Sequence, residues 1–128
     1  MSQEELPAPS ILVIDDNPDH LELVRRTLTA RGYRVCLAAN GETGLRLAIE
    51  QQPNLFVIDL GLPDIDGQTL IGRLRHMALF AETPIIACTA WPEETARSMV
   101  EMYGCNGYIS KPIRIADFAD RIASYLRR

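Results

Sequence analysis

Five short apolar runs alternate with segments of helical periodicity along this chain, and this alternation limits the folds that it can adopt. The runs are Ile11–Ile14, Arg34–Ala38, Leu55–Ile58, Ile85–Cys88 and Tyr108-Ile109. Most are apolar at consecutive positions, so both faces of each strand must be buried, as in a parallel sheet covered by helices on both sides. The pattern therefore predicts an α/β fold with a doubly wound, five-stranded parallel sheet, in one domain of 128 residues.

The segments between these runs carry the start and stop signals of helices. Asn17-Pro18 and Asn40-Gly41 place a cap residue before a helical pattern, and Gly32 and Gly104 end such patterns. The last helix has the most regular pattern, because its apolar residues recur at helical spacing: Ile115, Phe118, Ala119, Ile122, Ala123 and Leu126. Each strand is thus followed by one helix, which gives about five βα units.

Charge and hydropathy exclude two kinds of partner. Thirteen Lys and Arg residues against 17 Asp and Glu residues give a net charge of −4 and a pI near 5.1. Nucleic-acid binding needs a clustered positive surface, so we expect no nucleic acid to be bound by this domain. No apolar stretch approaches the roughly 18 residues of a membrane span, so we expect no membrane partner.

Residues 1–10 are interpreted as a flexible leader that precedes a single domain over residues 11–128. The leader is acidic and lacks the apolar segment of a secretory signal. The three cysteines are an odd number without C-x-x-C spacing, which favours reduced thiols over a disulfide framework. We therefore expect a cytoplasmic protein.

Polar residues follow four of the five expected strands. Asp15 and Asp16 come after the first run, Asp59 after the third, Thr89 after the fourth and Lys111 after the fifth. In open α/β sheets, ligands bind outside the carboxyl ends of the strands. One Asp at such a position is as often a turn or cap residue, but five polar residues at the correct strand ends indicate a functional site.

Three carboxylates at one sheet edge repel one another unless a cation holds them. Oxygen ligands with no histidine expected nearby favour a hard cation, with Mg²⁺ preferred over Zn²⁺. A Mg²⁺ ion beside a free carboxylate and a Lys suits phosphoryl transfer, because the two cations neutralise the phosphoryl oxygens while the carboxylate attacks in line. The residues therefore predict a site for Mg²⁺-dependent phosphoryl transfer.

Over Ile11 to Arg127, the chain resembles the receiver domain of two-component response regulators. The resemblance is carried by Asp15-Asp16, Asp59, the Gly61-Leu62-Pro63-x-x-Asp66-Gly67 loop, Thr89-Ala90 and Lys111-Pro112, in this order. It implies a flavodoxin-like (βα)5 receiver fold with the strand order 2-1-3-4-5. The stretch from Gly104 to Ile113 is further similar to single-domain receivers of the DivK type.

By this resemblance, Asp59 accepts a phosphoryl group from a histidine kinase or a histidine phosphotransfer protein, with Mg²⁺ as the cofactor. Asp16 would bind the Mg²⁺ directly and Asp15 mostly through water. Asp59 and the backbone carbonyl of Gly61 would supply further ligands. The same resemblance makes Lys111 the partner of the phosphoryl group.

The resemblance also implies a conformational switch. The Thr89 hydroxyl would move toward the phosphate, and Tyr108 would turn inward as it does so. Lys111-Pro112 is expected to be a cis peptide, which proline permits. Gly61 and Trp91 are candidates for residues that tune dephosphorylation.

We expect a phospho-acceptor switch with slow autodephosphorylation and no turnover enzyme. Its downstream protein target would bind the expected fourth helix (residues 92–103), the fifth strand and the last helix. The sequence leaves open whether the chain is a complete single-domain protein or part of a longer regulator or hybrid kinase.

Three other functions compete with this interpretation. A Mg²⁺-dependent phosphatase with an Asp nucleophile typically shows D-x-D on one strand, whereas here the acidic pair and Asp59 lie on different strands. A degenerate receiver that only binds proteins ranks lower, because every phosphorylation residue is present. A nucleotide-binding domain ranks lowest, because the chain lacks G-x-G-x-x-G and a Gly-Lys-Ser/Thr loop.

The sequence pattern alone does not decide the roles of His20, His76 and Trp91. His20 and His76 fall on or near polar helix faces, so we interpret both as surface residues. Trp91 either lies at the mouth of the site, where it would shield or admit water, or packs beside Pro92.

Overall fold

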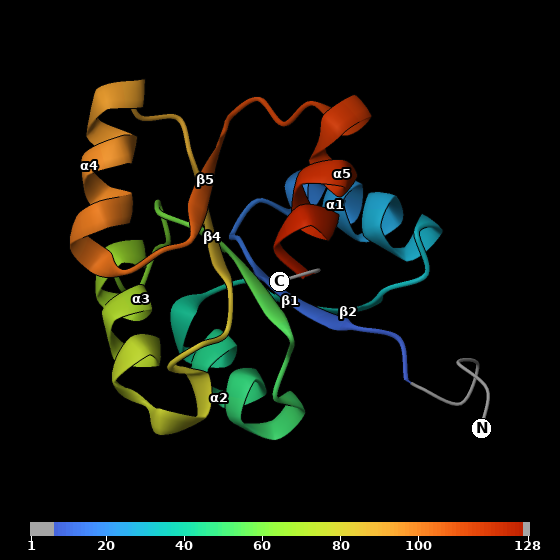
Figure 1. Cartoon of the computed structure of the whole chain (residues 1–128), viewed down its shortest axis with the longest axis horizontal. Coiled ribbons are helices and arrows are strands. Elements are labelled where there is room, and N and C mark those ends of the chain that lie inside the picture. Colours follow the sequence, from blue (N-terminus) through green and yellow to red (C-terminus); the bar gives the residue numbers. More distant parts are fainter. Residues whose placement is uncertain (1–6, 127–128) are drawn as a thin grey trace.

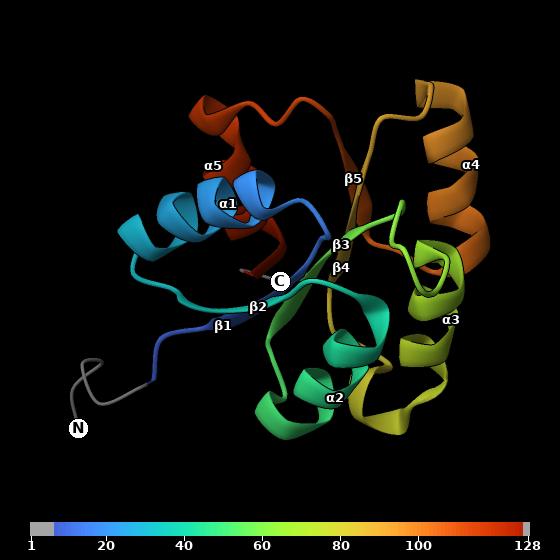
Figure 2. The same ribbon diagram turned by 180° about the vertical axis from the view of Figure 1, so that it is seen from behind.

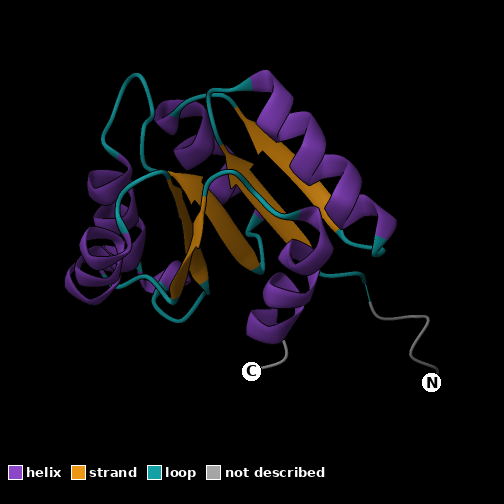
Figure 3. Ribbon diagram, turned by 90° about the horizontal axis from the view of Figure 1, so that it is seen from above, coloured by secondary structure: helices purple, strands orange, loops and turns teal. Residues whose placement is uncertain are grey.

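The computed structural model describes residues 7–126 and contains the predicted five-stranded parallel sheet. The strand order is β2-β1-β3-β4-β5, which confirms the expected doubly wound α/β fold. The strands are β1 (Ser10–Ile14), β2 (Arg34–Ala38), β3 (Leu55–Asp59), β4 (Ile85–Thr89) and β5 (Gly107–Ser110). Figure 3 shows the sheet in the middle of the molecule with helices on both sides.

Helices cover both faces of this sheet. They are α1 (Pro18–Ala30), α2 (Gly41–Gln51), α3 (Gly67–His76), α4 (Glu93–Tyr103) and α5 (Ile115–Leu126), and a short 3-10 helix, η2 (Ala78–Phe80), follows α3. Helices α1 and α5 lie together on one face, and α2, α3 and α4 lie on the other (Figures 1 and 2). The 3-10 helix was not predicted from the sequence.

The strands bury side chains on both faces because successive residues of a strand point in opposite directions. In β1, Leu12 and Ile14 belong to the core that α2, α3 and α4 cover. Ile11 and Val13 belong to the other core, beneath α1 and α5. This is why the strands read as continuous apolar runs and not as alternating ones.

The cap residues act as predicted. The Asn17 side chain accepts hydrogen bonds from the backbone N–H groups of Asp19 and His20, with Pro18 at the start of α1. The Asn40 side chain accepts from Thr43 at the start of α2. These caps set where each helix leaves the sheet edge, and so fix the loops that follow β1 and β2.

A few bounds differ from the sequence-based ones. β1 begins at Ser10, one residue before the expected domain start, because Ser10 pairs with Arg34 of β2. The rest of the predicted leader falls partly on residues 1–6, which lie outside the described residues. The Lys111-Pro112 peptide bond is cis, as expected. In the described part of the chain, no helix has the length and apolar character needed to cross a membrane.

Candidate functional site

Three carboxylates meet at the carboxyl edge of the sheet. β1 and β3 are neighbours, with Ile14 opposite Ile58, so the acidic pair after β1 lies level with Asp59 at the end of β3. One ligand atom from each of Asp15, Asp16 and Asp59 lies within 4.8 Å of the other two. Asp15 and Asp59 are buried and Asp16 is exposed. The strand order therefore brings together the carboxylates that the sequence placed at separate strand ends.

Lys111 completes this cluster from the loop after β5. Its Nζ atom lies 3.0 Å from Oδ1 of Asp59 and 3.6 Å from Oδ2 of Asp15. Burial alone would lower the pKa of Lys111, but the hydrogen bond with Asp59 and the charges of Asp15 and Asp59 outweigh it and raise the pKa. The ammonium group is therefore held in its charged form beside Asp59.

Asp15 is the most strongly buried of the three carboxylates. Burial is the main cause that raises its pKa, and the nearby charge of Asp59 adds to it. A backbone hydrogen bond from Asn17 to Oδ1 (2.8 Å) and the charges of Lys111 and His20 act in the opposite direction. The negative form of Asp15 is thus costly without a cation, which is the situation a bound metal ion relieves.

Thr89 and Gly61 border the same cluster. Thr89 ends β4 and is buried, and its Oγ1 accepts a hydrogen bond from the backbone N–H of Trp91 at 2.9 Å. The backbone N–H of Gly61 donates to Oδ1 of Asp59 at 3.3 Å. Both residues therefore lie beside Asp59, the carboxylate for which the resemblance implies the acceptor role.

A cavity of about 230 Å³ opens at this cluster, and Trp91 contributes to its wall together with Asp59, Leu60, Gly61, Thr89, Ala90 and Lys111. Trp91 is half-buried and also packs against the core beneath α2, α3 and α4. It thus lies at the mouth of the site while it packs against the core. Tyr108 is half-buried and packs against the same core.

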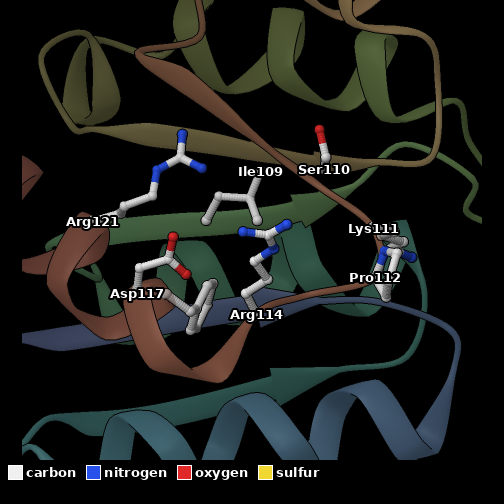
Figure 4. Close-up of a pocket in the computed structure, with 8 residues that line it drawn as sticks. Ile109, Ser110, Lys111, Pro112, Arg114, Asp117 and Arg121 are labelled. Atoms are coloured by element: carbon white, nitrogen blue, oxygen red, sulfur yellow. The ribbon is translucent and has the colours of Figure 1, made fainter.

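A larger pocket of about 430 Å³ lies between the end of β5 and α5 (Figure 4). Its lining comprises Ile109, Ser110, Lys111, Pro112, Arg114, Asp117, Phe118 and Arg121. Figure 4 shows Arg114 and Arg121 near Ile109, with Asp117 beside them, and Arg121 donates to the carbonyl of Tyr108 at 2.6 Å. This pocket lacks the carboxylate cluster, so the chemistry belongs to the smaller cavity, and Lys111 connects the two.

The two histidines differ in their surroundings. His76 is exposed, and its Nδ1 lies 2.8 Å from the carbonyl of Gly72, which agrees with a surface role. His20 is half-buried, with Nδ1 3.5 Å from Oδ2 of Asp15, so the expectation of no histidine near the carboxylates was wrong. The sequence missed this contact because helical spacing assigns a face of α1 but does not show that its first turn lies over the end of β1.

The donors present fit a small, hard cation. Carboxylate oxygens from Asp15, Asp16 and Asp59 converge, and hard divalent ions such as Mg²⁺ prefer oxygen ligands. A doubly wound sheet with these carboxylates, a Lys and a Thr at one edge defines a class of α/β protein whose site can hold a cation and a phosphoryl group together.

Comparison with known proteins agrees with this class. Residues 11–123 match the family model described as the response regulator receiver domain. The chain therefore belongs to the receiver domain family of two-component response regulators, whose members act as signalling phosphoacceptor domains, typically bind Mg²⁺, and interact with histidine kinases and downstream effectors.

Two curated relatives illustrate the similarity. The polar-differentiation response regulator DivK of Brucella anthropi is 33% identical over 117 residues, which cover 91% of this chain and 95% of DivK. The transcriptional regulatory protein KdpE of Mycobacterium tuberculosis is 36% identical over 118 residues, which cover 92% of this chain. The chain spans about half the length of KdpE (51%), so the two are similar over the receiver part only.

Solved structures show the same fold. The receiver domain of the sensor histidine kinase PA1611 from Pseudomonas aeruginosa, with a magnesium ion coordinated in its active-site cleft, has a TM-score of 0.86 and 29% identity, covering 94% of this chain and 99% of that one. A CheY-like receiver domain protein from Methanospirillum hungatei also has a TM-score of 0.86, with 27% identity and 94% of each chain covered.

Proposed function

We propose that Asp59 accepts a phosphoryl group from a phosphohistidine of a histidine kinase or a histidine phosphotransfer protein. The observation that carries this proposal is the 3.0 Å contact between Lys111 Nζ and Oδ1 of Asp59, inside a cluster of three carboxylates. In the transfer, an Asp59 oxygen forms the new P–O bond while the P–N bond breaks, and the imidazole of the donor leaves. Lys111 stays charged and pairs with the phosphoryl oxygens.

Mg²⁺ is the proposed cofactor. Asp16 and Asp59 would bind it directly, Asp15 mostly through water, and the backbone carbonyl of Gly61 would add a further ligand. When bound, the ion neutralises the charge of the phosphoryl oxygens. The buried positions of Asp15 and Asp59 support this assignment, because Lys111 supplies only one positive charge to a cluster of three carboxylates.

Thr89 and Tyr108 form the proposed switch. The Thr89 hydroxyl would leave the backbone N–H of Trp91, from which it now accepts a hydrogen bond, and donate to the phosphoryl group. A hydrogen bond to a charged group contributes about 1.5–3 kcal/mol, enough to make a minor conformation the major one. Tyr108 would then turn inward into the space that Thr89 leaves.

The partner surface is proposed to comprise α4, β5 and α5. Met102 of α4 and Ile115 of α5 are large apolar residues with 72% and 54% of their surface exposed, as expected of contacts that a partner covers. The pocket beside Arg114 and Arg121 lies on the same side of β5 as α5 and shares Lys111 with the acceptor site. Phosphorylation at Asp59 can therefore act on this surface through β5.

We further propose that the domain is a switch with slow autodephosphorylation, whose rate is tuned by Gly61 and Trp91. We also propose that it resides in the cytoplasm. Trp91 borders the cavity through which water would reach a phosphorylated Asp59. Burial raises the pKa of the Cys88 thiol to about 12, which keeps it protonated and unreactive. Multiple turnover on a small phosphomonoester would instead favour a phosphatase.

Intact-mass measurement tests the acceptor. With acetyl phosphate and Mg²⁺, we expect the wild-type protein to gain the mass of one phosphoryl group. Asp59→Asn should keep the fold and gain none, because its amide is not a nucleophile for phosphorus. A variant that is phosphorylated as efficiently as the wild type would show that Asp59 is not the acceptor.

A further inference from the structure

His20 lies beside the acidic cluster, but no step proposed above uses it. It belongs to the first turn of α1, and its Nδ1 atom lies 3.5 Å from Oδ2 of Asp15. The His20 side chain is 30% exposed overall, yet the Nδ1 atom is buried and has no hydrogen-bond partner among the described residues. Buried polar atoms are almost always hydrogen-bonded, so an orphaned ring nitrogen next to a carboxylate requires an explanation.

His20 can affect the cation site through the carboxylate of Asp15. Its Oδ1 atom accepts a 2.8 Å hydrogen bond from the backbone of Asn17. Its Oδ2 atom has looser neighbours, with Lys111 Nζ at 3.6 Å and His20 Nδ1 at 3.5 Å. One oxygen of this carboxylate is therefore fixed by the backbone, while the other is not yet held at hydrogen-bond distance.

We propose that His20 is a positioning residue of the cation site, which donates from Nδ1 to Oδ2 of Asp15 when a cation is bound. This inference rests on the Mg²⁺ site of the proposed function. Hydrogen bonds of a site are often long without its ligand and tighten when the ligand binds. Carboxylates at metal sites are themselves held by hydrogen bonds, and losing such a partner typically weakens metal binding 10- to 100-fold.

His20 acts on the carboxylate and does not serve as a further ligand. The carboxylate oxygens of Asp15, Asp16 and Asp59 form the group whose atoms all lie within 4.8 Å of one another, and the ring nitrogens of His20 fall outside it. The position of His20 in α1 also fits this role, because the N–H groups of Asp19 and His20 are capped by Asn17. The backbone of this turn is thus fixed at a place where His20 Nδ1 lies 3.5 Å from Oδ2 of Asp15.

Two substitutions separate a hydrogen bond from simple packing. His20→Asn keeps an N–H donor at the same position in the side chain as Nδ1, whereas His20→Leu fills similar space with methyl groups that cannot donate. Both new side chains are uncharged. If His20 only packed on the end of β1, the apolar Leu would replace it at least as well as Asn.

The experiment is a Mg²⁺ titration of the wild type and both variants at one fixed pH. Binding is followed by the emission of Trp91, the single Trp of the chain, which lines the cavity beside Asp59, and by calorimetry. We expect His20→Leu to weaken Mg²⁺ binding about 10-fold and His20→Asn to retain most of the affinity. His76→Leu is the matched control and should bind as the wild type does, because His76 contacts its own helix at Gly72.

Unchanged Mg²⁺ affinity in His20→Leu, or a loss in His20→Asn as large as in His20→Leu, would overturn the inference. Urea melts in EDTA check that each variant is folded, and His20→Met replaces the Leu variant if that one does not fold. A wild-type protein that fails to bind Mg²⁺ would overturn the metal site of the proposed function and this inference with it. Binding by the wild type with unchanged binding by His20→Leu would overturn this inference alone.

Discussion

At the scale of single residues, the surroundings of Asp15 in the folded protein disfavour the negative charge that a cation site needs. Burial raises the pKa of its carboxyl, and the neighbouring Asp59 adds to the effect, while Asn17, Lys111 and His20 partly oppose it. A carboxyl whose pKa is higher in the folded protein than in the unfolded chain binds more protons when folded. Its ionisation therefore lowers the stability of the folded protein.

The stability of the metal-free protein should depend on pH for this reason. As the pH rises from about 4, near the ordinary pKa of Asp, through the raised pKa of Asp15, we expect the contribution of Asp15 to the free energy of unfolding to fall. Asp15→Asn should remove that part of the pH dependence, and its Oδ1 can still accept from Asn17. Urea melts of both proteins in EDTA at a series of pH values measure the difference. Identical pH profiles would show that ionisation of Asp15 does not destabilise the folded protein.

At the scale of elements, side chains tie the helices to the loops around the sheet. Arg75, in the last turn of α3, donates to the carbonyls of Phe80, Thr83 and Gly104 and to the side chain of Asn106. Asn106 in turn accepts from the backbone of Ile85 in β4. α3, η2 and the segments that precede β4 and β5 are therefore fixed by one half-buried guanidinium group.

Removing this group should destabilise the fold without changing the site. Arg75→Met leaves several carbonyls without their charged donor, and each such bond contributes about 1.5–3 kcal/mol. Because Arg75 is half-buried, water can replace part of these bonds, so we expect the free energy of unfolding to fall by about 2–4 kcal/mol. Asp59 should still be phosphorylated in this variant. Arg73→Met, at an exposed position of the same helix, is the matched control and should change stability by less than about 0.5 kcal/mol. Equal effects of the two variants would contradict the role of Arg75.

The proposed coupling between Asp59 and β5 also belongs to the scale of elements. Thr89→Ala should still be phosphorylated at Asp59, because the hydroxyl takes no part in forming the P–O bond. It should lose most of the conformational response, since no hydroxyl can donate to the phosphoryl group. NMR spectra before and after acetyl phosphate treatment report this response through the shifts of α4 and β5. Shifts that are equal in the variant and the wild type would exclude Thr89 as the switch.

At the scale of the whole molecule, a cation that binds only the folded site should stabilise the entire domain. At a Mg²⁺ concentration ten times its Kd, the free energy of unfolding should rise by about 1.4 kcal/mol. Asp16→Asn removes a proposed direct ligand at an exposed position, so Mg²⁺ should stabilise it much less. Paired urea melts with EDTA and with excess Mg²⁺ measure both gains. An equal gain in the two proteins would mean that these carboxylates do not hold the ion.

Much of this arrangement was predictable from the sequence. Continuous apolar runs such as Ile11–Ile14 predicted a parallel sheet. Because parallel strands place their carboxyl ends at one edge, the sequence also predicted that Asp15, Asp16, Asp59 and Lys111 lie together there. The strand order came from the resemblance to a family. The contact of His20 with Asp15 could not be predicted, because it depends on how the first turn of α1 is set over β1. The bonds of Arg75 were not predictable either, since they join loops that have no periodic pattern.

The pairing of β1 with β3 makes the carboxylate cluster depend on the folded state of the chain. The acidic pair and Asp59 are separated by more than forty positions in the chain and meet because Ile14 lies opposite Ile58 in the central part of the sheet. A nascent or partly unfolded chain contains the same aspartates but not their constellation. Under the proposed function, only chains whose central strands have paired would therefore accept a phosphoryl group at Asp59.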